Sequence, residues 1–216
     1  MNNYRRLYPS SIKVRDLIAG GELGTVKALE YSWGEVFDWP TASGAYFGAK
    51  AGGRGVLADK GSHLLDLICW WLGGKPDVVS YQDDAMGGTE AVARLHFRKD
   101  QCDGLARFSW LSRYPNTFEV VGDRATLRGG LFDWNTVVIQ RDSEAPKTLR
   151  LTSAAKIPQD LGKNMLDNFL EVVSGRAAPL VSGDDVLPSI ELIDECYENR
   201  TRLSAPWYDA WQRIAS

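Results

Sequence analysis

The sequence predicts one α+β domain, with a mostly antiparallel open sheet and helices on one face of it. Short strand-like segments between residues 77 and 152 are joined by turns and not by helices, which favours antiparallel pairing. Amphipathic helical patterns lie on both sides of this series. The length of 216 residues suits a single domain, because domains commonly contain about 50–250 residues.

The N-terminal part predicts a helix, a tight turn and a strand. Pro9 and Ser10 suit a helix start, and Gly20-Gly21 suit its end. Apolar side chains recur between them at helical spacing, at Ile12, Val14, Leu17 and Ile18. A strand is expected over 25–33, TVKALEYSW, because β-branched and aromatic residues alternate there with polar ones.

Residues 34–55 form a long irregular segment that is rich in aromatic side chains. Long loops inside compact domains are usually functional. The aromatic faces could stack on a sugar ring or a nicotinamide, or they could simply anchor the loop to the core. On the first interpretation, Trp39 and Tyr46 are candidate substrate-binding residues.

The stretch 52–72, GGRGVLADKGSHLLDLICWWL, combines a glycine-rich approach, several ionisable groups and a long apolar run. If it is helical from about Lys60 onward, then Asp59, His63 and Asp66 lie on adjoining parts of one face. A histidine between two carboxylates is a candidate general base, although a hydrogen-bonded structural histidine is the alternative. His63 and Asp59 are therefore the candidate catalytic residues, and Arg54 and Asp66 join the candidate substrate-binding residues.

Seven further strands are expected, at 77–82, 90–97, 104–111, 117–121, 125–128, 136–140 and 147–152. We predict a sheet of about six to eight strands, with His96 as a structural strand residue. If helices cover one face only, apolar side chains such as Leu95, Phe108 and Trp110 need cover on the other. The sequence therefore predicts a homodimer or higher assembly through the open sheet face.

Two amphipathic helices are expected near the C-terminus, at 161–174 and 185–201, and they should lie on the same face of the sheet as the earlier ones. Gly175 suits the end of the first, and Ser182 suits the start of the second. Trp207, Trp211 and Ile214 favour a short terminal helix.

Composition excludes several classes of function. A formal net charge of -3 provides no basic footprint for nucleic acid or anionic lipid. The longest apolar stretch, 64–72, is too short to span a membrane, and the N-terminus has no signal-peptide core, so we expect a cytoplasmic protein. The three cysteines form no C-x-x-C pair, and two histidines cannot build a histidine-rich zinc site. A carboxylate-only magnesium site stays open, but no pattern marks one, so we predict no metal site.

One short segment resembles a cofactor motif. Residues 53–58, GRGVLA, match G-x-G-x-x-A, but a glycine-alanine loop precedes them where a Rossmann fingerprint needs a buried strand. The chain also lacks G-x-x-x-x-G-K-[ST], G-x-S-x-G and H-E-x-x-H. We therefore expect no cofactor-binding residues in this chain.

Four segments together resemble a known family: NYRR followed by Pro9, the run IAGGELGTVKALEYSW, the core G-G-x-G-x-L-x-D-x-G-x-H-x-x-D from Gly52 to Asp66, and the closing NMLDNFLEVVSGRAAPLVSGDDVLPSIELIDECYENR. In this order they are similar to the substrate domain of the glucose-fructose oxidoreductase, inositol dehydrogenase and rhizopine-catabolism family (Gfo/Idh/MocA). The resemblance covers nearly the whole chain. It implies the fold of a glyceraldehyde-3-phosphate dehydrogenase-like C-terminal domain.

The resemblance also implies site roles and partners. In the family, a D-x-x-x-H pair works with a lysine from an E-K-P segment of an N-terminal Rossmann domain that holds NAD or NADP. His63 matches the general base of that pair, and Asp59 matches its substrate-positioning carboxylate. The family's open sheet commonly packs against another subunit. No E-K-P segment occurs in this chain, and the family assigns no role to Lys60.

These observations lead to two functional hypotheses. In the first, residues 1–216 are the substrate-binding, catalytic and oligomerisation domain of an NAD(P)-dependent oxidoreductase that acts on a secondary hydroxyl of a sugar, a polyol or a related compound. The Rossmann domain is expected to be absent from this chain, so the chain alone should bind no cofactor and show no activity. In the second, the chain is a non-catalytic binding or assembly module derived from that domain.

Overall fold

The computed structural model describes residues 3–41, 54–85 and 88–204. Its strands are β1 (Val26–Gly34), β2 (Asp77–Asp83), β3 (Val92–Lys99), β4 (Cys102–Ser109), β5 (Thr117–Gly122), β6 (Ala125–Gly130), β7 (Thr136–Arg141), β8 (Lys147–Arg150) and β9 (Arg200–Arg202). They form one nine-stranded sheet in the order β8-β7-β6-β5-β1-β4-β3-β2-β9. Neighbouring strands are antiparallel except in the pairs β1–β4 and β2–β9. The predicted fold class, α+β with a mostly antiparallel open sheet, is confirmed.

The strand count exceeds the expected six to eight because of β9. The last helix was expected to continue to about 201, but it ends at Glu198. The chain then pairs with the free edge of β2, where Leu203 N–H donates to the Asp83 carbonyl at 2.7 Å. The three exposed residues of β9 carry no alternating pattern, so backbone pairing rather than side-chain burial forms this strand.

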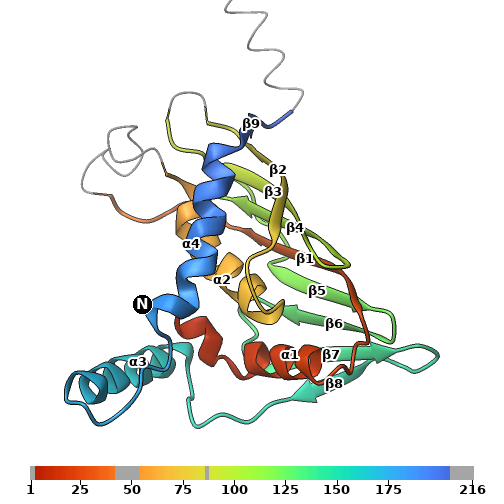
Figure 1. Cartoon of the computed structure of the whole chain (residues 1–216), viewed down its shortest axis with the longest axis vertical. Helices are drawn as coiled ribbons and strands as arrows, with labels where there is room; N and C mark the ends of the chain where they lie inside the picture. The colour runs from red at the N-terminus through yellow and green to blue at the C-terminus, as the bar shows by residue number, and fades with distance from the viewer. Residues whose placement is uncertain (1–2, 42–53, 86–87, 205–216) are drawn as a thin grey trace, which may run out of the picture.

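The helices are α1 (Pro9–Ala19), α2 (Ser62–Trp71), α3 (Pro158–Val173) and α4 (Gly183–Glu198), with a 3-10 turn η1 (Tyr4–Leu7) before α1. Helices α1, α2 and α4 cover one face of the sheet (Figure 1). Helix α2 continues from a π-helical turn, η4 (Leu57–Gly61). Helix α2 ends at Trp71, and Gly73 follows with a φ of 73° that suits glycine and lets Gly74 N–H reach the Cys69 carbonyl at 2.8 Å.

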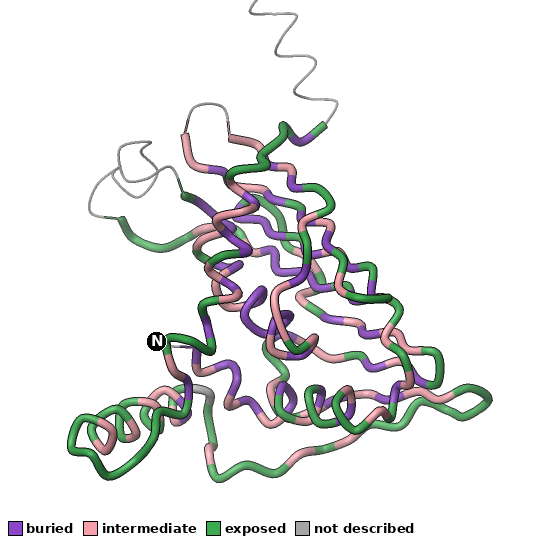
Figure 2. Tube along the Cα trace, viewed as in Figure 1, coloured by how far each residue is buried: buried purple, intermediate pink, exposed green. Residues whose placement is uncertain are grey.

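The core lies between α2 and the middle of the sheet, where buried positions gather in Figure 2. Trp71 of α2 stacks on Tyr31 of β1 with ring centroids 5.8 Å apart, and Phe118 of β5 meets both rings. Aromatic contacts of this kind contribute about 0.5–1.5 kcal/mol beyond area burial. They fix α2 across the strands that carry the site described below.

The apolar side chains that were expected on the open face lie instead under the helices. Leu95 and Phe108 are fully buried, and Trp110 is nearly so. Phe108 and Trp110 do lie on the same side, as their spacing indicates, but strand alternation alone does not say which side the helices cover. The predicted reason for an assembly through the open face was therefore wrong.

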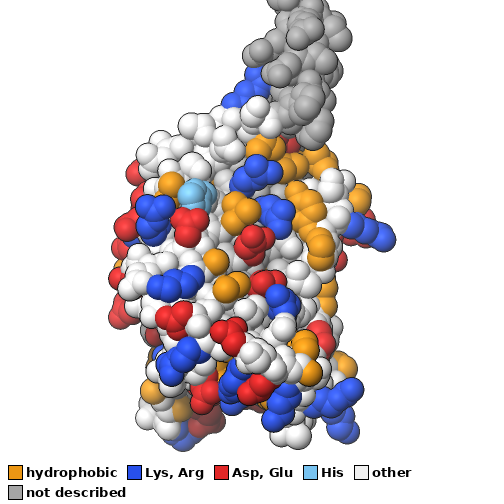
Figure 3. Space-filling view, turned by 90° about the vertical axis from the view of Figure 1, so that its right-hand side faces the viewer, with side chains coloured by type: hydrophobic (Ala, Val, Ile, Leu, Met, Phe, Trp, Pro, Cys, Tyr) orange, Lys and Arg blue, Asp and Glu red, His pale blue; other side chains and the backbone are white. Residues whose placement is uncertain are grey.

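The open face carries charged side chains (Figure 3). Arg107 of β4 pairs with Glu30 of β1 at 3.4 Å, and Arg128 of β6 pairs with Glu119 of β5 at 2.9 Å. His96 lies on this face and contacts Asp103 at 2.9 Å, away from the candidate site. These exposed pairs make the open face polar and leave the core on the helix side.

Helix α3 departs from the expected arrangement. It was expected to cover the sheet, but it extends from one corner of the molecule (Figure 1) and contacts η1. Its apolar stripe is mostly exposed, with Leu161 buried and Met165 half-buried. The exposed members are Leu166, Phe169, Leu170 and Val173. The helical period was thus predicted correctly, whereas the packing partner was not.

Two predictions fall outside the described residues: the terminal helix with Trp207 and Trp211, and the part of the aromatic loop that contains Tyr46. Among the residues that are described, no helix is both long and apolar enough to cross a membrane.

Candidate functional site

The site begins where two parallel neighbours in the sheet end together. Strands β1 and β4 pair in parallel, so their carboxyl ends meet at one edge. The pairing continues past the strands, because Glu35 N–H donates to the Ser109 carbonyl at 3.1 Å and Phe37 N–H to the Trp110 carbonyl at 2.8 Å. A Cβ on Gly34 would lie 2.5 Å from the Ser112 carbonyl oxygen. Only glycine allows this close passage.

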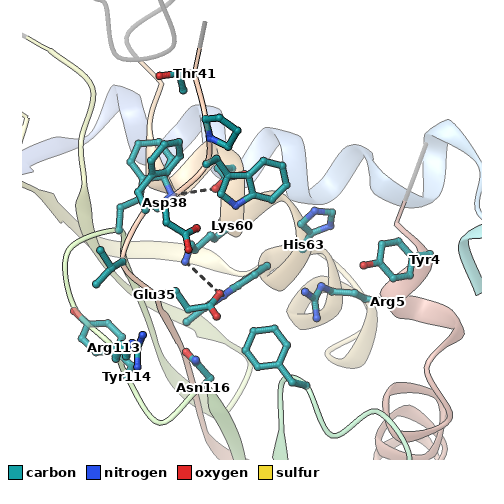
Figure 4. A pocket seen from close by; sticks show the side chains of 18 residues that line it. Tyr4, Arg5, Glu35, Asp38, Thr41, Lys60, His63, Arg113, Tyr114 and Asn116 are labelled. Carbon is teal, nitrogen blue, oxygen red and sulfur yellow. Dashed lines mark hydrogen bonds and ion pairs between the residues drawn. The ribbon is translucent and has the colours of Figure 1, made fainter. Parts of the chain in front are cut away.

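A cavity of about 1230 Å³ opens beyond these strand ends (Figure 4). The end of β1 and the chain after it, the β4–β5 connection, η4, α2, η1 and the β6–β7 connection contribute to its wall. The lining residues are Tyr4, Arg5, Trp33, Glu35, Val36, Phe37, Asp38, Trp39, Pro40, Thr41, Asp59, Lys60, His63, Trp110, Arg113, Tyr114, Asn116 and Phe132. Aromatic side chains and ionisable side chains contribute equally to this wall. A cavity that combines aromatic surface with polar groups is typical of a small-molecule site.

The turn η4 presents two of these groups, and Glu90 holds it in place. The N–H groups of Gly55 and Leu57 both donate to Glu90 Oε1 at 3.0 Å, and Val56 N–H donates to the Glu90 carbonyl at 2.9 Å. Wider π turns are frequent at functional sites. Here the turn precedes α2 directly, and both Asp59 and His63 line the cavity.

His63 is in a state that suits proton acceptance. Burial, together with the nearby positive charge of Arg5, holds the pKa of His63 below its ordinary value of 6.5. Its ring lies 6.2 Å from the Trp33 ring, and its Nδ1 is buried without a hydrogen-bond partner among the described residues. The imidazole is therefore mostly neutral at neutral pH, and a neutral imidazole has one ring nitrogen that can accept a proton.

Asp59 is fixed from one side only. Its Oδ2 accepts a hydrogen bond from Trp110 Nε1 at 3.0 Å, and no second hydrogen bond or ion pair of its carboxylate is found in the described part of the chain. The carboxylate is exposed to the cavity. It can therefore accept a hydrogen bond from a ligand hydroxyl near His63.

Lys60, to which the sequence assigned no role, also lies in the wall. Its Nζ is 3.8 Å from Glu35 Oε2 and 5.1 Å from the centre of the Trp33 ring. Burial lowers the pKa of Lys60. Glu35 in turn accepts a hydrogen bond from Trp33 Nε1 at 2.8 Å, so the ion pair and the indole hold one another in place.

The structure brings His63, Asp59 and Trp39 to this cavity, but not Arg54 or Asp66. Trp39 lines it with 77% of its surface exposed. Arg54 instead pairs with Asp194 of α4 at 2.6 Å and lies over the Tyr197 ring. Tyr46 lies outside the described residues.

Asp66 was expected to bind substrate, but it is buried in an ion pair and does not line the cavity. It is 1% exposed, and its two oxygens accept from Arg6 Nη2 and Nε at 2.6 and 2.9 Å. Helix α2 is enclosed on several sides, so its polar residues do not share one solvent face. His63 faces the cavity, whereas Asp66 faces Arg6 of η1.

Sequence reasoning missed several wall residues, among them Arg5, Trp33, Glu35 and Trp110. Trp33 and Trp110 come together because β1 and β4 are parallel neighbours. That pairing is not visible in strand patterns, which predict strands but not their partners. The one available signal was the cluster of aromatic and charged residues at the end of each strand.

The described part of the GRGVLA segment, residues 54–58, does not fit the phosphates of a dinucleotide. The N–H groups of Gly55 and Leu57, which a phosphate would need, already donate to the Glu90 carboxylate. A Cβ on Gly55 would lie 2.0 Å from the Glu90 carbonyl oxygen, so this glycine serves close packing. This geometry agrees with the rejection of the segment as a Rossmann fingerprint. No cluster of potential metal ligands occurs among the described residues either.

Comparison with solved structures finds the same fold in oxidoreductases. An aldose-aldose oxidoreductase from Caulobacter crescentus, complexed with glycerol, matches with a TM-score of 0.73 at 21% identity, over 91% of this chain and 59% of that one. A 3-ketoreductase from Actinomadura kijaniata, in complex with TDP-benzene and NADP, matches with a TM-score of 0.73 at 17% identity, over 94% and 62%. The chain thus spans about three fifths of the length of these structures.

A putative oxidoreductase from Erwinia carotovora atroseptica matches with a TM-score of 0.72 at 14% identity, over 94% of this chain and 64% of that one. A comparison with curated protein sequences found no match. The model of the GFO/IDH/MocA C-terminal domain matches residues 11–128, more than half of the chain. The chain therefore belongs to the Gfo/Idh/MocA oxidoreductase family, within which it corresponds to the C-terminal domain.

Proposed function

We propose that this chain is the substrate domain of an NAD(P)-dependent oxidoreductase that acts on a secondary hydroxyl of a sugar, a polyol or a related compound. The observation that carries the proposal is the placement of a neutral His63 and an exposed Asp59 in one cavity. Oxidation of an alcohol requires removal of the hydroxyl proton, and a neutral imidazole can accept it.

The two residues have distinct tasks in this proposal. Asp59, held by Trp110 Nε1, accepts a hydrogen bond from a substrate hydroxyl and orients it. His63 takes the proton, and the carboxylate of Asp59 stabilises the imidazolium that forms. In the reverse direction His63 returns the proton to the developing alkoxide.

The hydride acceptor would be a nicotinamide held outside this chain, because side chains cannot take up hydride. The N–H groups of Gly55 and Leu57 already donate to Glu90 and are not available to a dinucleotide phosphate. This part of the proposal is supported by the 3-ketoreductase, whose structure contains NADP. The aldose-aldose oxidoreductase, complexed with glycerol, supports a polyhydroxylated substrate. The isolated chain should accordingly bind no NAD(P) tightly in calorimetry and show no turnover.

The alternative is a non-catalytic binding or assembly module with the same fold. The enclosed pair Arg6–Asp66 and the exposed α3 are compatible with either function. The two hypotheses predict different activities for the protein that contains this chain. An oxidoreductase reduces NAD(P) with a polyol, whereas a module binds its ligand without any change of the nicotinamide spectrum.

The deciding experiment measures turnover in the complete enzyme, in which a dinucleotide-binding domain accompanies this chain. His63→Ala should lower kcat by about 10²- to 10⁴-fold, the usual share of general acid–base catalysis, and Asp59→Asn should lower it as well. His96→Ala is the matched control, because His96 lies on the open sheet face. Full activity of His63→Ala would overturn the proposal.

A further inference from the structure

Two neighbouring arginines of η1 differ sharply in how their charge is satisfied. Arg5 and Arg6 are 7% and 6% exposed. Arg6 donates to both oxygens of Asp66, at 2.6 and 2.9 Å, and also to the Asp185 carbonyl at 2.6 Å. This is the arrangement expected of a buried arginine, since an unpaired buried charge is costly.

Arg5 has no such partner. Its Nη1 donates one long hydrogen bond, 3.3 Å, to the Leu131 carbonyl, and its Nε is buried without an acceptor. It forms no ion pair with any residue in the ranges 3–41, 54–85 and 88–204. The guanidinium lies 4.6 Å from the centre of the Trp33 ring. Such a stack offsets only part of the desolvation of a charge.

The unpaired charge faces the cavity. Figure 4 shows the Arg5 guanidinium pointing toward the cavity interior beside His63, while Glu35 and Asp38 lie on the other side. The buried lysine in the wall already has a carboxylate, because Lys60 pairs with Glu35. Arg5 is thus a buried cation at the cavity without an acidic partner in the described part of the chain.

We propose that Arg5 binds an anionic group of the substrate, so that the cavity takes a hydroxylated compound that carries a carboxylate or a phosphate. This deepens the proposed function and rests on it, because it assumes that the cavity is the substrate site. The planar guanidinium can donate two parallel hydrogen bonds to the paired oxygens of such groups. To bind an anion, Nη1 and Nη2 would lose at most the one long hydrogen bond from Nη1 to the Leu131 carbonyl. Trp33 holds the plane of the fork in place before the anion arrives.

An anion at Arg5 would also favour the chemistry. The charge of Arg5 disfavours protonation of His63. A bound carboxylate or phosphate offsets that charge, so the imidazolium forms more readily when the substrate is present. An anionic substrate would therefore be selected both in binding and in the proton transfer.

The first test measures the binding of three six-carbon ligands and of one inorganic anion to the 216-residue chain, by calorimetry at fixed ionic strength. The probes are neutral D-glucitol, D-gluconate, D-glucitol 6-phosphate and inorganic phosphate. We expect an anionic polyol to bind at least about tenfold more tightly than glucitol, as charge-assisted hydrogen bonds allow. Gluconate as the tighter ligand assigns a carboxylate, and the phosphate ester as the tighter ligand assigns a phosphate. Equal affinities, or no saturable binding of either anion, overturn the proposal.

The second test changes the arginine. Arg5→Gln should abolish the preference for the anion and keep the affinity for glucitol, whereas Arg98→Gln, on the open sheet face, should keep the preference. Arg5→Gln should also unfold at nearly the temperature of the unchanged chain, while Arg6→Gln, which breaks the pair with Asp66, should unfold well below it. A preference that survives in Arg5→Gln, or an Arg5→Gln chain as destabilised as Arg6→Gln, contradicts the proposal. Neither result bears on the turnover of His63→Ala, which decides the proposed function separately.

Discussion

His63 links the chemistry of the site to the stability of the fold. Its folded-state pKa is held below 6.5 by burial and by Arg5, so between that lowered pKa and 6.5 the unfolded chain binds more protons than the folded one. Stability contributed by the neutral ring is therefore present above pH 6.5 and is lost as the pH falls through the folded-state pKa. This sign is opposite to that of a histidine that gains an ion pair on folding.

We therefore expect the free energy of unfolding of the chain to fall, relative to His63→Gln, as the pH is lowered from 7.5 to 5.5. Urea unfolding of both proteins at several pH values measures the difference. His96→Gln retains His63 and should show the same fall as the unchanged chain. A pH dependence that is identical in the unchanged chain and in His63→Gln would show that the ring is not held neutral.

For single residues, the sequence predicted which side chains could take part in chemistry better than it predicted which side chains they contact. The spacing of Asp59 and His63 indicated a shared site, and both line the cavity. Asp66 has the same kind of spacing, yet it pairs with Arg6, 60 positions earlier in the chain. Nothing in the local pattern distinguishes a carboxylate that faces a ligand from one that faces a distant arginine. That distinction requires the tertiary structure.

Among the elements, the turn η4 depends on the carboxylate of Glu90, which lies later in the chain, between β2 and β3. Glu90 is fully buried and accepts hydrogen bonds from Gly55, Leu57 and the Tyr197 hydroxyl, the last at 2.7 Å. Arg200 donates to its other oxygen at 3.2 Å. Burial raises the pKa of Glu90, although these hydrogen bonds work against the rise. The carboxylate is thus the common acceptor for the start of the site helix, α4 and β9.

Glu90→Ala should lower the free energy of unfolding by about 2–5 kcal/mol, because each buried donor left without an acceptor costs about 1–3 kcal/mol. Urea unfolding measures this, and Glu119→Ala is the control, since an exposed ion pair contributes only about 0–1 kcal/mol. Turnover of the complete enzyme should fall as well, because η4 positions Asp59. A loss below about 1 kcal/mol would mean that water replaces the carboxylate.

The elements themselves were largely predictable, and their partners were not. Residue periodicity predicted α1, α2 and eight of the strands to within a few residues. It could not predict the π turn, which depends on Glu90 about thirty residues later, or β9, which backbone pairing forms. For α3 the period of the apolar positions is clear, but exposed Phe169 and Leu170 show that an amphipathic helix need not face the sheet of its own chain.

For the whole molecule, the two faces of the sheet have different roles. The helix side holds the core and the cavity, whereas the open side is a charged surface (Figure 3). Leu105, Val121 and Val138 are half-buried, and Leu105 lies opposite Glu30 while Val138 lies opposite Arg128. The sequence predicted an assembly because apolar side chains on the open face would need to be buried, but those side chains are already buried under the helices. What supports it now is the resemblance to a family whose open sheets pair, together with a face on which both signs of charge alternate and can match a second copy.

If two copies pair through this face, light scattering at micromolar concentration and low salt should give twice the chain mass of 24.0 kDa. Because exposed charges are screened by ions, higher salt should shift the mass toward one chain. The double change Arg107→Glu and Arg128→Glu breaks two charge pairs of the open face and should give the single-chain mass even at low salt. Lys163→Glu, on α3 away from the sheet, should leave the dimer intact. A single-chain mass at every salt concentration would exclude this assembly, and a dimer that both sets of variants retain would place the interface elsewhere, with the exposed stripe of α3 the next surface to change.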